Sequence, residues 1–207
     1  MYYAVRKGKQ PGIYETWDEA KVQVEGFLRP EFKKFKTTEE AEAFMENRDI
    51  WKERIEEDLK NEYLVAFTDG SFNKDLKRYS YGVLFILPNG EEENLYGYGE
   101  DENYMDSQNI IGEVLGVLKA LEWAIGKNYK KIKIYHDYSG LSKWALGQWK
   151  ANVNVSQMYV KEYKEKYEGK IEVEFIKVPS HSNISYNEMV DSLAKFALLG
   201  NEKKRRN

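Results

Sequence analysis

Carboxylate side chains at four places in this 207-residue chain could bind metal ions together. They are Asp69 at the end of the apolar run 63–68, Glu113 where a helix is predicted to begin, Asp137 after the predicted strand 131–136, and Asp191 in the last predicted helix. After Asp69 we expect the strand to turn at Gly70. Two like charges about 4 Å apart repel by roughly 4 kcal/mol at an effective dielectric near 20. Such a cluster therefore takes up protons or binds cations, and we predict divalent metal.

Composition narrows the choice of metal and the class of protein. The chain has no cysteine, which excludes disulfides, thiolate catalysis and cysteine-type zinc sites and suits a cytoplasmic location. Oxygen ligands favour Mg²⁺, with Mn²⁺ as the other candidate. The sequence contains neither an apolar run of about 18 residues nor a signal peptide, so we expect no membrane association. A hydrophobic content of 42% is enough for one domain and a smaller companion.

The net charge of −3 conceals an uneven distribution along the chain. Residues 1–37 carry eight lysines and arginines against five acids, whereas residues 38–62 carry four against ten. Within the acidic stretch, residues 47–61 have few apolar side chains and are predicted to form a solvated helical linker. The N-terminal part is therefore a basic head.

Short elements are predicted in the head, with a start signal for each helix. We expect strands at 2–6, 13–15 and 32–35, and helices from Trp17 and over 38–46. Thr16 with Glu19, and Thr37 with Glu40, each fit a capping box, in which hydroxyl and carboxylate satisfy free backbone groups at a helix start.

Beyond residue 62, alternating and apolar patterns predict a larger α/β unit. Strands are expected at 63–68, 80–87, 93–99, 131–136 and 171–178, with helices at 112–125, 139–147 and 156–167 and at the C-terminal end. Residues 88–90 (Pro-Asn-Gly) predict a hairpin turn. Antiparallel strands followed by strand–helix alternation indicate a mixed sheet with helices on its faces.

The head resembles the hybrid-binding domain at the amino end of many type 1 ribonucleases H. The resemblance lies in residues 2–17 (YYAVRKGKQPGIYETW), 23–27 (QVEGF) and 32–37 (FKKFKT). It implies that Trp17 and Phe32 pack on the DNA strand and that Lys33 and Lys34 hold its phosphates. From composition alone, both rings would more often belong to the core, since aromatic residues mostly serve packing.

Residues 62–199 resemble a type 1 ribonuclease H catalytic domain. The motifs are Asp69-Gly-Ser, Asn109-Ile-Ile-Gly-Glu113, Asp137, Val178-Pro-Ser-His181, and Asn187-Glu188 with Asp191, in this order and spacing. The resemblance implies a ribonuclease-H-like mixed five-stranded sheet flanked by helices, preceded by a small α+β domain. The residues after Asp137 are similar to those of a bacterial subgroup.

By resemblance, the four carboxylates would hold two metal ions, with Asp69 bridging them, Asp137 on the nucleophile side, and Glu113 with Asp191 on the leaving-group side. Hydrolysis would leave 5′-phosphate and 3′-hydroxyl ends. Glu113 would also contact an RNA 2′-hydroxyl, the group that distinguishes RNA from DNA, and Asn109 would read the minor groove of the hybrid.

Two further catalytic candidates have structural alternatives. His181 matches a loop histidine that assists proton transfer or product release, or it makes ordinary hydrogen bonds. Glu188 matches a catalytic position, but residues 185–188 also fit a capping box. His136 neighbours Asp137 on a strand, where adjacent side chains face opposite ways, and is not predicted to be catalytic.

Substrate contacts near the site depart from the commoner family pattern. Tyr138 stands where many relatives have serine, and Ile110 replaces a second amide. Trp149 and Lys150 are candidates for DNA-strand contact in a protruding segment, whereas Trp144 is predicted to belong to the core.

We therefore predict a hybrid-binding domain at 1–46, a charged linker at 47–61, a catalytic domain at 62–199 and a basic tail at 200–207. The predicted function is endonucleolytic cleavage of the RNA strand of RNA/DNA hybrids, without an obligatory protein partner. The alternatives are another, DNA-cutting nuclease of the ribonuclease-H-like superfamily, and a non-catalytic binder of hybrid or double-stranded RNA.

Overall fold

The structure is a computed structural model that describes residues 1–179 and 185–200. The chain divides into two compact units between Glu56 and Glu57. This division falls inside one helix, α3 (Ile50–Lys60). The two units are best considered separately.

The first unit is a small three-stranded antiparallel sheet with two helices. Its elements are β1 (Tyr2–Lys7), β2 (Gly12–Tyr14), α1 (Trp17–Val24), β3 (Glu31–Phe35) and α2 (Thr38–Met45), with strand order β2-β1-β3. Both predicted capping boxes are confirmed: Thr16 and Thr37 each accept a hydrogen bond from the backbone N–H three residues later, and the glutamate there reciprocates. A core of Val5, Ala20 and Val24 is too small to bury every ring of this unit.

The segment predicted to be a solvated helical linker is helical, but one of its acids is buried along with two of its apolar residues. α3 covers Ile50–Lys60, and three of its side chains are buried: Ile50, Ile55 and Asp58. Asp58 is only 7% exposed, although the local sequence is strongly acidic. A buried carboxylate requires partners, because an isolated charge away from water is costly.

The second unit contains the predicted mixed five-stranded sheet. Its strands are β4 (Leu64–Asn73), β5 (Arg78–Ile86), β6 (Glu92–Gly99), β7 (Lys131–His136) and β8 (Glu172–Lys177), in the order β6-β5-β4-β7-β8. β4, β5 and β6 pair antiparallel, whereas β7 joins β4, and β8 joins β7, in parallel. The predicted hairpin turn is confirmed, since the N–H of Gly90 donates to the carbonyl of Leu87.

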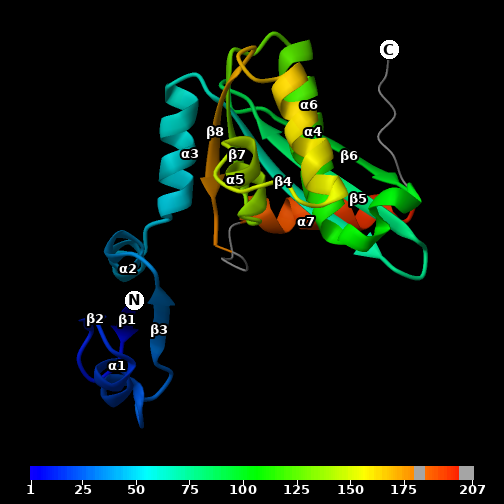
Figure 1. Cartoon of the computed structure of the whole chain (residues 1–207). Helices are drawn as coiled ribbons and strands as arrows, with labels where there is room; N and C mark the ends of the chain where they lie inside the picture. The colour runs from blue at the N-terminus through cyan, green and yellow to red at the C-terminus, as the bar shows by residue number, and fades with distance from the viewer. Residues whose placement is uncertain (180–184, 201–207) are drawn as a thin grey trace. The chain divides into compact units, whose positions relative to one another are not determined.

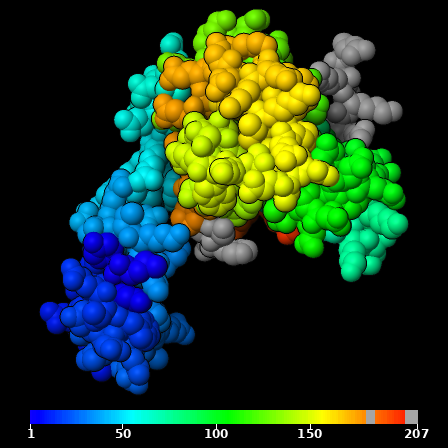
Figure 2. Space-filling model, viewed as in Figure 1, coloured from blue at the N-terminus to red at the C-terminus, as the bar shows by residue number. Residues whose placement is uncertain are grey.

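Helices cover both faces of this sheet (Figure 1). They are α4 (Asn109–Gly126), α5 (Gly140–Ala145), α6 (Asn154–Lys166) and α7 (Ser185–Leu198), with a 3₁₀ helix η1 (Glu102–Ser107) that the sequence did not predict. α4 is the most buried, and α5 and α6 form much of the surface over it in Figure 2 (yellow-green and yellow). α7 packs on the opposite face, where Gly82 lies against its backbone.

Two predicted boundaries were wrong near the candidate site. β4 does not turn at Gly70 but continues to Asn73 and pairs with β5 throughout. α4 begins at Asn109 rather than at residue 112, so that Glu113 lies in its second turn. No helix in the described part of the chain is long and apolar enough to span a membrane.

Candidate active site

An unusually close approach between β4 and α4 brings the first two acids together. A Cβ added to Gly70 would lie 2.2 Å from the backbone nitrogen of Glu113, and one added to Gly112 would lie 2.1 Å from the carbonyl oxygen of Ser80. No larger residue fits either position without moving the backbone. Glycines at these two places therefore let the helix carry Glu113 against the strand that carries Asp69.

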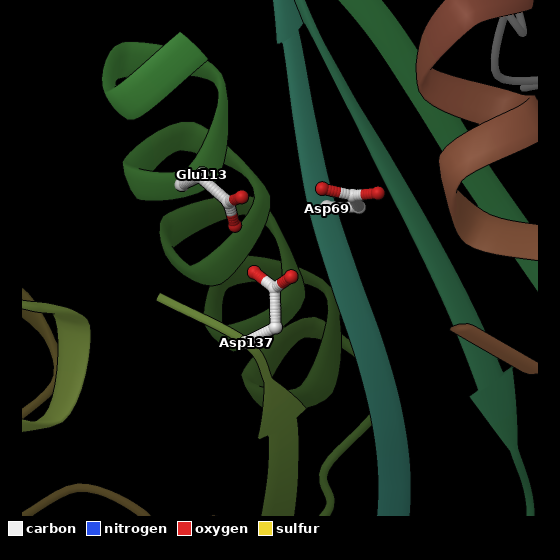
Figure 3. A group of neighbouring side chains, drawn as sticks. All are labelled: Asp69, Glu113 and Asp137. Carbon is white, nitrogen blue, oxygen red and sulfur yellow. The ribbon is translucent and has the colours of Figure 1, made fainter. Parts of the chain in front are cut away.

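Three of the four predicted metal ligands converge. Oxygen atoms of Asp69, Glu113 and Asp137 all lie within 4.8 Å of one another. Figure 3 shows the three carboxylates pointing toward one another from β4, from α4 and from just beyond the end of β7. Asp69 is further fixed by the N–H of Gly70, which donates to its Oδ1 at 2.8 Å.

Crowding and burial shift the protonation of this cluster. Burial is the largest reason that the pKa of Asp69 is raised to about 6; the charges of Asp137 and Asp191 add to it, while hydrogen bonds from Glu113 and Gly70 act in the opposite direction. Burial raises the pKa of Glu113 well above its ordinary range, followed by the charges of Asp69 and Asp137. Without a cation the cluster therefore holds on to protons.

The donor set fits a divalent cation. Glu113 is 3% exposed, and its Oε2 is buried without a hydrogen-bond partner. A buried carboxylate oxygen without a partner is costly, and a cation would satisfy it. Three carboxylates supply only oxygen ligands, as hard ions such as Mg²⁺ prefer.

Asp191 lies outside the group of three. Its Oδ2 is 2.7 Å from the Nζ of Lys195, one turn later on α7, and its side chain is 40% exposed. Its charge nevertheless contributes to the raised pKa of Asp69. Glu188, in the first turn of the same helix, is exposed. Its two readings, catalysis and helix capping, both stay predictions.

The two histidines differ in what can be said of them. His181 lies outside the described residues, and so does the basic tail. His136 is fully buried and its Nδ1 lies 3.0 Å from the carbonyl oxygen of Tyr138. Burial lowers the pKa of His136 to about 4, so the ring is neutral near pH 7. That His136 is not catalytic stays a prediction.

Asn109 and Tyr138 flank the acids. Asn109 is exposed at the first position of α4, one turn before Glu113, so both side chains project from the same side of the helix. Tyr138 follows Asp137, and a Cβ on Gly140 would lie 2.3 Å from its ring, so the ring covers that glycine. Its ring also meets Trp144 edge-on, with centroids 5.6 Å apart.

The head presents an exposed aromatic surface with lysines around it. Trp17 and Phe32 are 40% and 43% exposed, and their ring centroids are 5.7 Å apart. Lys33 and Lys34 are both exposed on β3, where Lys34 lies on the side of these rings and the Nζ of Lys33 lies 5.8 Å from the ring centroid of Phe35. A third ring, Tyr3, lies 5.7 Å from Trp17 with Lys34 over its face. Sequence reasoning missed Tyr3, although alternation along β1 could have placed it on this side.

The two tryptophans in and just after α5 have different environments, and the prediction that Trp144 belongs to the core is confirmed. Trp144 is buried at 8% exposure in the main core, whereas Trp149 is 44% exposed with Lys143 4.7 Å from its ring centroid. Lys150 is exposed next to it. A second residue that the sequence did not single out is Lys177, whose Nζ donates to the backbone carbonyls of Asp137 and Val178 and so ties the ends of β7 and β8.

The raised pKa of Asp69 predicts how the metal-free protein responds to pH. A carboxyl whose pKa is about 3.9 unfolded and about 6 folded destabilises the fold as pH rises from about 4 through 6. In EDTA, Asp69→Asn should therefore raise the melting temperature by several degrees at pH 7.5 and leave it unchanged near pH 4. Thermal denaturation at both pH values checks this; a variant less stable than wild type at pH 7.5 would contradict it.

The fold and the acidic cluster define a nuclease-type α/β domain of the ribonuclease-H-like class. The family model described as RNase H matches residues 61–198, and the one described as Ribonuclease H1 N-terminal domain matches residues 1–45. The chain belongs to the ribonuclease H family. It is thus a hydrolase of the class that cuts the RNA strand of RNA/DNA hybrids.

Individual relatives agree with both matches. Human ribonuclease H1 is 23% identical over 260 residues, covering 94% of this chain and 88% of the human protein. Ribonuclease H of Saccharomyces cerevisiae is 50% identical over 44 residues, which cover 21% of this chain and 13% of the yeast protein. The structure of RNase H1 from the archaeon Halobacterium salinarum NRC-1 matches with a TM-score of 0.56 at 20% identity, covering 67% of this chain and 99% of that one.

Proposed function

We propose that the chain cleaves hybrid RNA with two divalent ions, Mg²⁺ or Mn²⁺, and leaves 5′-phosphate and 3′-hydroxyl ends. The observation that carries this proposal is the convergence of Asp69, Glu113 and Asp137, whose oxygens lie within 4.8 Å of one another. The unsatisfied Oε2 of buried Glu113 supports a cation there. A binding protein would gain nothing from facing phosphates with these acids.

In this proposal Asp69, Glu113 and Asp137 hold the ions, and Asp191 is the fourth ligand. When bound, two divalent ions supply an activated water and charge stabilisation on the leaving 3′-oxygen. The protein's own part is to keep the carboxylates together and partly shielded from water. His181 and Glu188 are proposed to assist proton transfer or product release.

Selectivity for RNA would come from groups beside the acids. Glu113 and Asn109, on successive turns of α4, would meet the 2′-hydroxyl and the minor groove. Trp149 and Lys150 would contact the DNA strand, since an exposed ring beside a cation suits base or sugar packing and phosphate contact. A nuclease that cuts DNA would not need the contacts of Glu113 and Asn109, because its substrate strand has no 2′-hydroxyl.

The chemistry of the product ends tests this proposal. RNA released from a hybrid in Mg²⁺ should accept a 5′ label from polynucleotide kinase only after phosphatase treatment, and its 3′ ends should be extended by poly(A) polymerase without treatment. Cyclic or 3′-phosphate ends would instead indicate attack by the 2′-hydroxyl, and the metal-hydrolysis proposal would fail.

We also propose that the head binds the hybrid and raises its local concentration at the catalytic unit. Trp17→Ala combined with Lys33→Ala should weaken hybrid binding about tenfold or more, because a stacked ring and a phosphate contact are both lost. The maximal rate at saturating hybrid should be unchanged. Fluorescence anisotropy and steady-state cleavage measure the two quantities.

Lys52→Ala is the matched control, since it removes one exposed charge of the first unit on α3, whereas the rings lie on β1, α1 and β3. It should change hybrid affinity much less than the double variant does. If the double variant lowers the saturated rate as much as the affinity, the proposed division of labour is wrong.

A further inference from the structure

Asp58 is buried in a part of the chain that neither family match covers. The matches end at residue 45 and resume at residue 61, and Asp58 lies between them near the end of α3. It is 7% exposed, whereas its neighbour Glu57 is exposed. The compact second unit nevertheless begins at Glu57, before the matched catalytic region does.

The Asp58 carboxylate makes two strong contacts to β7. Its Oδ2 accepts a hydrogen bond of 2.5 Å from the hydroxyl of Tyr135, and its Oδ1 is 2.7 Å from the Nζ of Lys133. Lys133 also lies 3.2 Å from Glu174 on β8. Removing one member of such a buried charged group leaves the others without compensation, which typically destabilises strongly.

Tyr135 is the end ring of a stack of three rings that links two neighbouring strands of the sheet to α7. It stacks on Phe67 of β4, with centroids 4.8 Å apart and planes at 28°, and Phe67 in turn lies 5.4 Å from the ring of Tyr186 on α7. The stack therefore joins β7, β4 and α7. β4 and α7 carry Asp69 and Asp191, and Asp137 directly follows β7.

The position of this stack along the strands links it to the acids. Phe67 and Tyr135 are the last partners in the parallel register of β4 with β7. Asp69 and Asp137 each come two residues later, beyond the paired segment. The contact between the rings of Phe67 and Tyr135 is therefore the last one between β4 and β7 before the two acids, and Asp58 fixes it by accepting from the hydroxyl of Tyr135. We expect the distance between the two carboxylates to depend on this contact.

We propose that Asp58 is a positioning residue for the acidic centre. By fixing Tyr135 and Lys133 it holds the ends of β4 and β7 at the spacing at which Asp69 and Asp137 share a cation. This inference rests on the proposed metal-dependent function. It also makes the last turn of α3 part of the catalytic unit rather than of the linker.

The test uses full-length protein with Asp58→Asn and Tyr135→Phe. Glu57→Gln is the charge-matched exposed control, and Val155→Ala, a truncation of a buried residue on α6, is the control for lost stability. Three quantities are measured well below the melting transition: the Kd for Mn²⁺ by calorimetry, the Mg²⁺ concentration at half-maximal cleavage, and the melting temperature.

Asp58→Asn and Tyr135→Phe should each weaken metal binding about 3- to 10-fold, less than loss of a group that touches a ligand directly. The double variant should bind metal only slightly more weakly than either single variant, because both substitutions break the same hydrogen bond between Tyr135 and Asp58. Asp58→Asn should also lower the melting temperature by roughly 5 to 10 °C. Glu57→Gln should match wild type, and Val155→Ala should lose stability with an unchanged metal Kd.

The inference is overturned if Asp58→Asn loses stability with wild-type metal affinity, or if Val155→Ala weakens metal binding equally. These outcomes leave the proposed function intact, because wild type still binds and requires metal. If the wild-type protein cleaves without metal, the proposed function fails. Measuring the wild-type protein first therefore distinguishes failure of the proposed function from failure of this inference.

Discussion

Asp69→Asn is expected to reduce cleavage of hybrid RNA at least about a thousandfold while hybrid affinity stays within about threefold. Asp69 contributes an oxygen to the group within 4.8 Å and is held by the N–H of Gly70, so the amide removes charge where cations are proposed to bind. The substitution keeps the side-chain shape, and the proposed hybrid contacts of the head are on another unit.

Single-turnover cleavage in Mg²⁺ and anisotropy in EDTA measure the two quantities. Asp75→Asn is the matched control, because it makes the same change at an exposed residue between β4 and β5 and should leave both unchanged. If Asp69→Asn cleaved within tenfold of wild type, the acidic cluster would not be the site of cleavage. If it lost hybrid binding as much as cleavage, the loss of activity could not be assigned to the chemical step.

Gly70→Ala is expected to lower cleavage about a hundredfold and to reduce the melting temperature. The new Cβ would lie 2.2 Å from the nitrogen of Glu113, so α4 must move away from β4 and carry Glu113 away from Asp69. A misplacement of about 1 Å in a catalytic group can cost this much in rate. Cleavage and thermal denaturation of the full-length protein measure both effects.

Gly126→Ala provides the control on the same helix, at its far end. A Cβ there meets nothing within 4 Å, and alanine is the better helix former, so cleavage and stability should stay at or slightly above wild type. If Gly70→Ala kept wild-type cleavage, the close packing of β4 on α4 would not be what places Glu113.

Periodicity and local hydrogen-bond signals predicted most of the fold. The alternation in β8 and the apolar pattern of α4 gave the correct element types, because Val173 and Phe175 of β8 and the apolar residues of α4 pack on the same core. Both capping boxes of the head were confirmed, since they depend only on residues three positions apart. Trp144 was correctly predicted to be buried, because the apolar residues next to it in the sequence are too small to supply another large anchor.

What the sequence could not predict are contacts between distant segments. Gly70 suggested a turn, yet in the structure its missing side chain lets α4, which begins almost forty residues later, pack closely against β4. Asp58 looked like one more solvated acid, because its partner Tyr135 is 77 residues away. Likewise, only the folded chain shows that Asp191 lies outside the group of three, whereas its pairing with Lys195 is a local contact one turn along the same helix.

The most direct test of the central proposal is cleavage of four end-labelled substrates by the wild-type protein in Mg²⁺ and in EDTA. The substrates are an RNA/DNA hybrid, an RNA duplex, a DNA duplex and single-stranded RNA. We predict cutting of the RNA strand of the hybrid alone, and only with metal. Cutting in EDTA, cutting of the DNA duplex, or tight hybrid binding without any cutting would contradict the account.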